Sequence, residues 1–176
     1  MSRKGASKIR QVEPDAIYNS VLVSKIINAI MKDGKRNAAE KQIYQALELI
    51  KKDFPKESEL EVLERAIENI KPKIEVRPRR IGGAVYQIPT PVRGLRQNAL
   101  AIRWLISASR ARSNKQYHSF AQKIVAELND ALSNSGAAVA KRMEVERMAE
   151  ANKAFAHFRW ELKYQSQAPR LFGVFC

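Results

Sequence analysis

The chain has 176 residues, and its 32 lysines and arginines against 18 aspartates and glutamates give a formal net charge of +14. That length fits one domain with its own hydrophobic core, and so large a positive surplus predicts a polyanionic partner. The single cysteine, Cys176, excludes a disulfide framework or a cysteine metal site within the chain and indicates a reducing compartment. No apolar run approaches the roughly 20 residues of a membrane-spanning helix, so we expect no membrane partner.

Residues 1–13 lack periodicity and form a predicted basic arm. Its cations all precede the first acid, Glu13, and they are Arg3, Lys4, Lys8 and Arg10. No apolar signal core follows them, so secretion is not expected. The composition is typical of a segment that becomes ordered on a polyanion, although a solubilising tail would have the same composition.

Three amphipathic helices are predicted next, at about residues 15–31, 35–53 and 58–71, because apolar residues recur there every three or four positions. Ser58 and Glu61 have the spacing of a capping box at the start of the third. The second and third helices form the acidic part of the chain, with Glu40, Glu48, Asp53, Glu57, Glu59, Glu61, Glu64 and Glu68. We interpret this part as scaffold.

Between residues 73 and 91 the pattern changes from helical to extended, which predicts a β-hairpin. Gly82 and Gly83 supply the positive φ angles of a tight turn, and Pro78 and Pro89 restrict the pairing to two strands. An isolated ribbon is marginally stable in water. With few apolar partners of its own, the hairpin is expected to project as an arm that gains order from another surface.

Three further helices are predicted at about residues 93–112, 117–134 and 138–160. The apolar stripe of the first of these is Leu95, Ala99, Ile102 and Ile106. The fold class is therefore mainly α, with six helices and a two-stranded β-hairpin between the third and the fourth. Residues 161–176 have no clear period and are left as an extension of unknown structure.

The positive charge is concentrated between residues 71 and 115, where the only acid is Glu75. The basic residues of this stretch are Lys71, Lys73, Arg77, Arg79, Arg80, Arg93, Arg96, Arg103, Arg110, Arg112 and Lys115. A solvated helix face would intersperse acids with these cations. Arginine takes phosphate in a bidentate grip and stacks on bases, so the stretch predicts nucleic-acid binding, above all to folded RNA.

The sequence contains few residues that could catalyse a reaction or bind a metal. The two histidines, His118 and His157, lie on different predicted helices, and no nucleophile, paired-carboxylate or metal-binding motif is present. The Gly82-Gly83 pair is not followed by the Gly-Lys-Ser/Thr sequence of a phosphate-binding loop. We therefore expect no enzyme, no cofactor and no metal. Tyr86 beside Gln87 could stack on a base or pack on the body of the protein.

Two other functions remain as alternatives. An architectural DNA-binding protein could use an arginine-rich ribbon in the minor groove, but it would usually carry apolar wedges at the ribbon tip, where this chain has residues 81–84, Ile-Gly-Gly-Ala. An RNA-modifying enzyme would need a cofactor loop or a nucleophile, and neither is visible.

Several motifs in register resemble one known family. The hairpin at residues 79–89, RRIGGAVYQIP, is similar to the Arg-Arg-Val-Gly-Gly-Ser-Thr-Tyr-Gln-Val-Pro of the family of the seventh protein of the bacterial-type small ribosomal subunit. The resemblance continues through DGK at residues 33–35, NALAIRW at residues 98–104 and RMAEANKAFAHFRW at residues 147–160. It covers roughly residues 14–160.

The resemblance implies a six-helix bundle with the hairpin between the third and fourth helices. It also implies direct binding to the 3′ major (head) domain of small-subunit ribosomal RNA, nucleation of head assembly, and a hairpin near messenger RNA and exit-site transfer RNA. The small-subunit proteins nine and eleven are the implied protein partners. The residues carried over to RNA are Lys35, Arg36, Arg77, Arg79, Arg80, Arg93, Arg96 and Arg103; those near exit-site transfer RNA and messenger RNA are Arg79, Arg80, Gly82, Gly83, Tyr86 and Gln87.

The sequence also departs from the family pattern. Ala84 and Val85 replace a Ser-Thr pair, which removes two hydroxyls from the hairpin tip, and Glu146 stands where many members have histidine. We divide the chain into a basic arm (1–13), one helical RNA-binding domain (14–160) with the ribbon at about 73–91, and an extension (161–176). The expected location is the small ribosomal subunit, in a bacterial cytoplasm or inside a plastid or mitochondrion.

Overall fold

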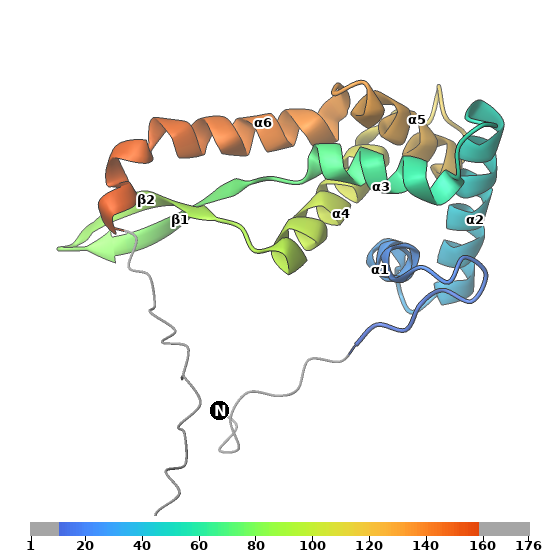
Figure 1. The fold of residues 1–176 in the computed structure, drawn as a ribbon, viewed down its shortest axis with the longest axis horizontal. Coiled ribbons are helices and arrows are strands. Elements are labelled where there is room, and N and C mark those ends of the chain that lie inside the picture. The colour runs from blue at the N-terminus through green and yellow to red at the C-terminus, as the bar shows by residue number, and fades with distance from the viewer. Residues whose placement is uncertain (1–10, 159–176) are drawn as a thin grey trace, which may run out of the picture.

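The computed structural model describes residues 11–158 and is mainly helical, with one antiparallel hairpin between the third and fourth helices (Figure 1). This confirms the predicted fold class. The elements are α1 Val21–Ile30, α2 Arg36–Asp53, α3 Glu59–Ile70, β1 Ile74–Ile81, β2 Ala84–Pro91, α4 Gly94–Ala111, α5 Phe120–Leu132, α6 Gly136–Ala151 and the 3₁₀ helix η1 Lys153–Phe158. Among residues 11–158 no helix combines the length and the apolar character that crossing a bilayer requires. Most of the predicted arm and all of the predicted extension lie outside the described residues.

The core of the bundle surrounds α5, which packs against α2, α3, α4 and α6. Apolar side chains of every α-helix meet there, and the largest fully buried ones include Ile27, Leu47, Ile50, Ile67, Leu105 and Leu128. Each such side chain contributes about 1.5–3 kcal/mol by leaving water. The helices that border α5 are therefore held as one body, to which the hairpin is attached.

The first helix starts later than predicted, at Val21 instead of about residue 15. The carboxylate of Asp15 accepts hydrogen bonds from the backbone N–H groups of Ile17 and Tyr18, each at 3.2 Å, and this folds the preceding residues into a turn. The Tyr44 hydroxyl of α2 donates to the same carboxylate at 2.9 Å. Burial and this hydrogen bond raise the pKa of Tyr44 to about 12, so the hydroxyl keeps its donor proton.

Two later helix boundaries were also predicted wrongly. Helix α5 begins at Phe120 because Ser119 and Gln122 form a reciprocal capping box, which the sequence analysis overlooked. The last helix was predicted to run to residue 160, but α6 ends at Ala151. There the Asn152 side chain donates to the Met148 carbonyl at 2.8 Å, and the chain turns into η1.

The hairpin has the predicted strands and turn. Gly82 and Gly83, with φ of +57° and +93°, form the two-residue connection between the paired residues Ile81 and Ala84. The hairpin lies at the opposite end of the molecule from α2 (Figure 1). It has more partners within the chain than the few that were predicted, because β1 packs against α6 and β2 packs against η1.

A buried carboxylate of α5 connects the end of α4 with the start of α6. Glu127 of α5 is only 1% exposed; its Oε2 accepts from Nε of Arg112, just after α4, and its Oε1 accepts from the backbone N–H of Ala138 in α6, both at 2.8 Å. The carboxylate thereby satisfies one of the unpaired N–H groups at the start of α6. Gly136 lets α6 approach this closely, with a φ of +89°.

Replacing Gly136 with alanine should lower the free energy of unfolding by about 2 kcal/mol, since a strained positive φ costs about 1–3 kcal/mol. The added Cβ would also lie 2.9 Å from Asp130 Cβ and 3.0 Å from Glu127 Oε1. Gly34→Ala is the matched control, because Gly34 has a φ of +71° and nothing within 4 Å of an added Cβ. Urea unfolding should show a smaller loss for the control; equal losses would contradict the role given to the α5–α6 contact.

Candidate nucleic-acid interface

The predicted RNA-binding residues are spread over several elements of the molecule. Within the described residues they lie on the hairpin, along α4 and just beyond its end, and at the start of α2. Arg3, Lys4, Lys8 and Arg10 lie outside the described residues. The hairpin and the residues that follow it hold Lys73, Arg77, Arg79, Arg80, Arg93, Arg96, Arg103, Arg110 and Lys115, all exposed.

Helices α1 and α4 border a groove that is lined by both apolar and basic side chains. Its volume is about 1000 Å³, and its lining includes Val21, Ile102 and Ile106 together with the cations Lys25, Arg103 and Arg110. The Nη2 of Arg110 donates to the carbonyl of Ile30 at 3.0 Å, so a positive charge is fixed at the C-terminal end of α1. A polyanion could therefore meet both cations and apolar surface here.

Two residues that line the groove differ from the sequence-based prediction, one in its exposure and one because it was not predicted as part of the site. Leu95, expected on the buried stripe of its helix, is 76% exposed, while Ile102 and Ile106 of that stripe are buried together with Ala101 and Leu105. Lys25 was missed by the sequence analysis. It is the only charged residue of α1, and that isolation on an otherwise apolar helix was the available signal.

At the base of the hairpin two of the arginines share one carboxylate. Glu75 is buried, and its Oε1 accepts from Arg77 Nε at 2.5 Å, while Arg96 Nε lies 2.9 Å from Oε1 and 2.8 Å from Oε2. Burial by itself would raise the pKa of Glu75, but the hydrogen bonds and charges of Arg96 and Arg77 outweigh burial and lower it. The carboxylate is therefore ionised, and it connects β1 to the first turn of α4.

Two other predicted cations have partners within the chain. Arg112 is only partly exposed: it pairs with Glu127 and Asp130, and its guanidinium carbon lies 5.6 Å from the centre of the Tyr117 ring. Arg36 pairs with Glu40 on α2 at 2.7 Å. The contact made by Arg112 with two carboxylates gives that residue a role in holding α4 and α5 together. The exposed pair on α2 contributes little.

An aromatic cluster holds the outer part of the hairpin against η1. The Tyr86 ring lies 5.2 Å from the ring of Phe155 and 5.6 Å from that of Phe158, measured between centroids. His157 packs on Phe158 with 3.9 Å between ring centroids. Of the two roles considered for Tyr86, the structure supports packing on the body, while Gln87 remains exposed.

Glu146, which stands where many members of the resembled family have histidine, also makes contacts in this region. One carboxylate oxygen of Glu146 accepts from the backbone N–H of Lys73 at 3.3 Å, and the other lies 3.5 Å from Nη1 of Arg142. Glu146 therefore ties α6 to the start of β1. The Ala84-Val85 departure leaves Val85 64% exposed at the hairpin tip.

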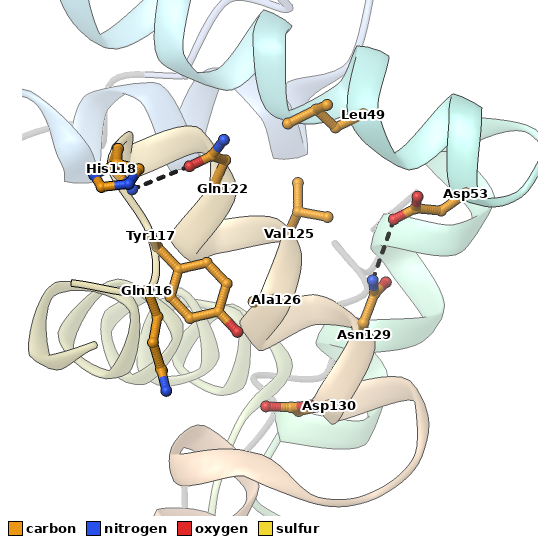
Figure 2. Close-up of a pocket in the computed structure, with 10 residues that line it drawn as sticks. All are labelled: Leu49, Asp53, Gln116, Tyr117, His118, Gln122, Val125, Ala126, Asn129 and Asp130. Carbon is orange, nitrogen blue, oxygen red and sulfur yellow. Dashed lines mark hydrogen bonds between the residues drawn. The ribbon is translucent and has the colours of Figure 1, made fainter. Parts of the chain in front are cut away.

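A second hollow, of about 560 Å³, lies between α2 and α5 and is polar (Figure 2). Figure 2 shows Asn129 donating from Nδ2 to Asp53 at 3.2 Å, and the backbone N–H of His118 donating to Gln122 at 3.1 Å. His118 lies here and His157 on η1, so the two histidines do not form one site. Over residues 11–158 no three His, Cys, Asp or Glu side chains are grouped as metal ligands.

The chain matches the model of a protein family described as Ribosomal protein S7p/S5e over residues 2–153. It is similar to the small ribosomal subunit protein uS7 of Thermosipho melanesiensis, with 49% identity over 158 residues that cover 90% of this chain and 99% of that protein. The uS7 proteins of a Sulfurihydrogenibium species and of Pelagibacter ubique are 51% and 52% identical over 160 residues, 91% of this chain and 100% of each relative.

Replacing Tyr86 with alanine should speed hydrogen exchange of the β2 amides about tenfold, because aromatic pairs contribute about 0.5–1.5 kcal/mol beyond their buried area. Tyr86→Phe is the matched control, since the hydroxyl makes no hydrogen bond within residues 11–158 and the ring is retained. Exchange followed by mass spectrometry should leave the control unchanged. Unchanged exchange in the alanine variant would show that the cluster does not hold the hairpin.

Proposed function

This chain belongs to the ribosomal protein S7p/S5e family and is a structural component of the small ribosomal subunit, and from that premise we propose that it binds the head domain of small-subunit ribosomal RNA directly. The observation that carries the proposal is the concentration of exposed cations on the hairpin and α4, beside the basic groove between α1 and α4. Phosphates of a folded RNA are the ligands that such a surface fits.

In the proposed mechanism the helical body and the hairpin make different contacts with the RNA. Lys25, Arg103 and Arg110 line the groove on the rigid helical bundle, so phosphate contacts there set the register of the protein on the RNA. The hairpin lies against α6 and η1 and adds contacts through the exposed Arg79 and Arg80. Specificity then comes from RNA shape, because only a folded RNA can meet both surfaces at once.

The finer assignments rest on the resemblance of the sequence motifs. The protein nucleates assembly of the head, and its hairpin lies near the messenger RNA exit channel and exit-site transfer RNA. Its protein neighbours are small-subunit proteins nine and eleven. It acts as a structural component and not as an enzyme, in a bacterial cytoplasm or an organelle interior. Lys35, Arg36, Arg93 and Lys115 are further proposed RNA contacts, as are Arg3, Lys4, Lys8 and Arg10.

A filter-binding titration tests the proposal by comparing a transcript of the head domain with duplex DNA of the same length at one salt concentration. Preference for the head-domain transcript by about a hundredfold or more is expected, since specific complexes are typically at least that much tighter than non-specific ones. The same comparison separates the proposal from an architectural DNA-binding function. Equal affinities would overturn it.

The Arg79→Ala, Arg80→Ala double variant should bind the head-domain transcript more weakly. Its salt dependence should also be flatter, by about one unit of slope for each arginine that no longer neutralises a phosphate. Lys51 and Lys52, exposed at the far end of α2, provide a matched double alanine control with the same change in charge. An unchanged slope in the Arg79 and Arg80 variant, or an equal change in the control, would remove the hairpin from the interface.

A further inference from the structure

Glu75 occupies an unusual position, because it is a buried acid in the most basic part of the chain. It lies on β1 at the base of the hairpin, and it contacts one arginine from its own strand, Arg77, and one from the first turn of α4, Arg96. A surface that only had to attract RNA would gain from losing this negative charge. Its presence between two arginines therefore calls for a physical reason.

The geometry of the two arginines supplies that reason. Both hydrogen-bond Glu75 through Nε, and within the described residues neither guanidinium makes another hydrogen bond. The Glu75 side chain is 9% exposed, whereas the side chains of Arg77 and Arg96 are 51% and 53% exposed. One buried anion thus fixes two guanidinium groups from the inside, while their terminal nitrogens remain available on the outside.

We propose that Glu75 is a positioning residue that holds Arg77 and Arg96 together as a two-guanidinium clamp for one backbone phosphate of RNA. The inference deepens the proposed function and rests on it. The three side chains together carry one net positive charge, which matches the single negative charge of a phosphodiester. Each guanidinium offers paired N–H donors to phosphate oxygens, and holding both in place beforehand reduces the side-chain entropy lost on binding.

The alternative is that Glu75 only bridges the hairpin to α4, and the two roles predict opposite signs. Changing Glu75→Gln adds one positive charge to the protein, so with a purely bridging role RNA binding should tighten or stay the same. With the positioning role the arginines lose their anchor, and affinity for the head-domain transcript should fall by about three- to tenfold despite the added charge.

Glu64→Gln is the matched control, because Glu64 is exposed on α3 and its loss changes the net charge equally. Filter binding at one salt concentration should give weaker binding for Glu75→Gln and equal or slightly tighter binding for Glu64→Gln. Circular dichroism and thermal unfolding establish that both variants are folded. If folded Glu75→Gln binds as tightly as wild type, or more tightly, the clamp is refuted.

A second variant keeps the test decisive if Glu75→Gln unfolds. The Arg77→Lys, Arg96→Lys double variant retains both charges at exposed positions but loses the planar, bidentate donors. It should bind the transcript about three- to tenfold more weakly. Unchanged affinity of the lysine variant would refute the clamp alone, as long as wild type still prefers the head-domain transcript to duplex DNA. Loss of that preference in wild type would instead refute the proposed function.

Discussion

The attachment of the hairpin depends on the interaction of one buried carboxylate, Glu75, with two arginines. Exposed cations crowd this part of the chain, and without an opposite charge their mutual repulsion would push β1 away from α4. Glu75 counters the repulsion from a position where water cannot screen it fully, and the hydrogen bonds from Arg77 and Arg96 outweigh the cost of its burial. This contact joins β1 to α4, and the packing of β1 on α6 and of β2 on η1 holds the rest of the ribbon in place.

A similar arrangement closes the other side of the bundle. Arg112, Glu127 and the start of α6 form a buried network that fixes the end of α4 against α5. In both networks a buried acid pairs with arginine from the basic stretch, Glu75 with Arg77 and Arg96, and Glu127 with Arg112. Several acids of α2 and α3 pair locally with basic neighbours, as Glu40 does with Arg36. Charge is therefore segregated, with the hairpin and α4 presenting cations and α3 presenting acids.

Local signals predicted much of this fold, because they depend on residues close in sequence. The spacing of apolar residues located all six α-helices, and Gly82 and Gly83 located the hairpin turn to the residue. Wherever a partner from a distant part of the chain decided the outcome, the prediction was wrong or incomplete. The Asp15 turn before α1 also holds a hydrogen bond from the distant Tyr44, and the packing of Tyr86 depends on Phe155 and Phe158.

The same limit applies to the candidate site. Composition alone identified the basic stretch, but it could not distinguish an arginine turned to solvent, such as Arg103, from one in a buried network, such as Arg112. Lys25 entered the groove only through the packing of α1 beside α4. For the family to which this chain belongs, the motifs identified the function, while the structure shows which cations remain accessible to a polyanion.

On the proposed function, RNA occupies the cationic side of the molecule and leaves α3 and the second half of α2 free. Hydrogen–deuterium exchange of the full chain, with and without the head-domain transcript, tests it most directly. Exchange should become slower in the hairpin and in the segments of α1 and α4 that border the groove, and it should stay unchanged in α3 and the second half of α2. Protection of α3 with an unprotected hairpin would contradict it.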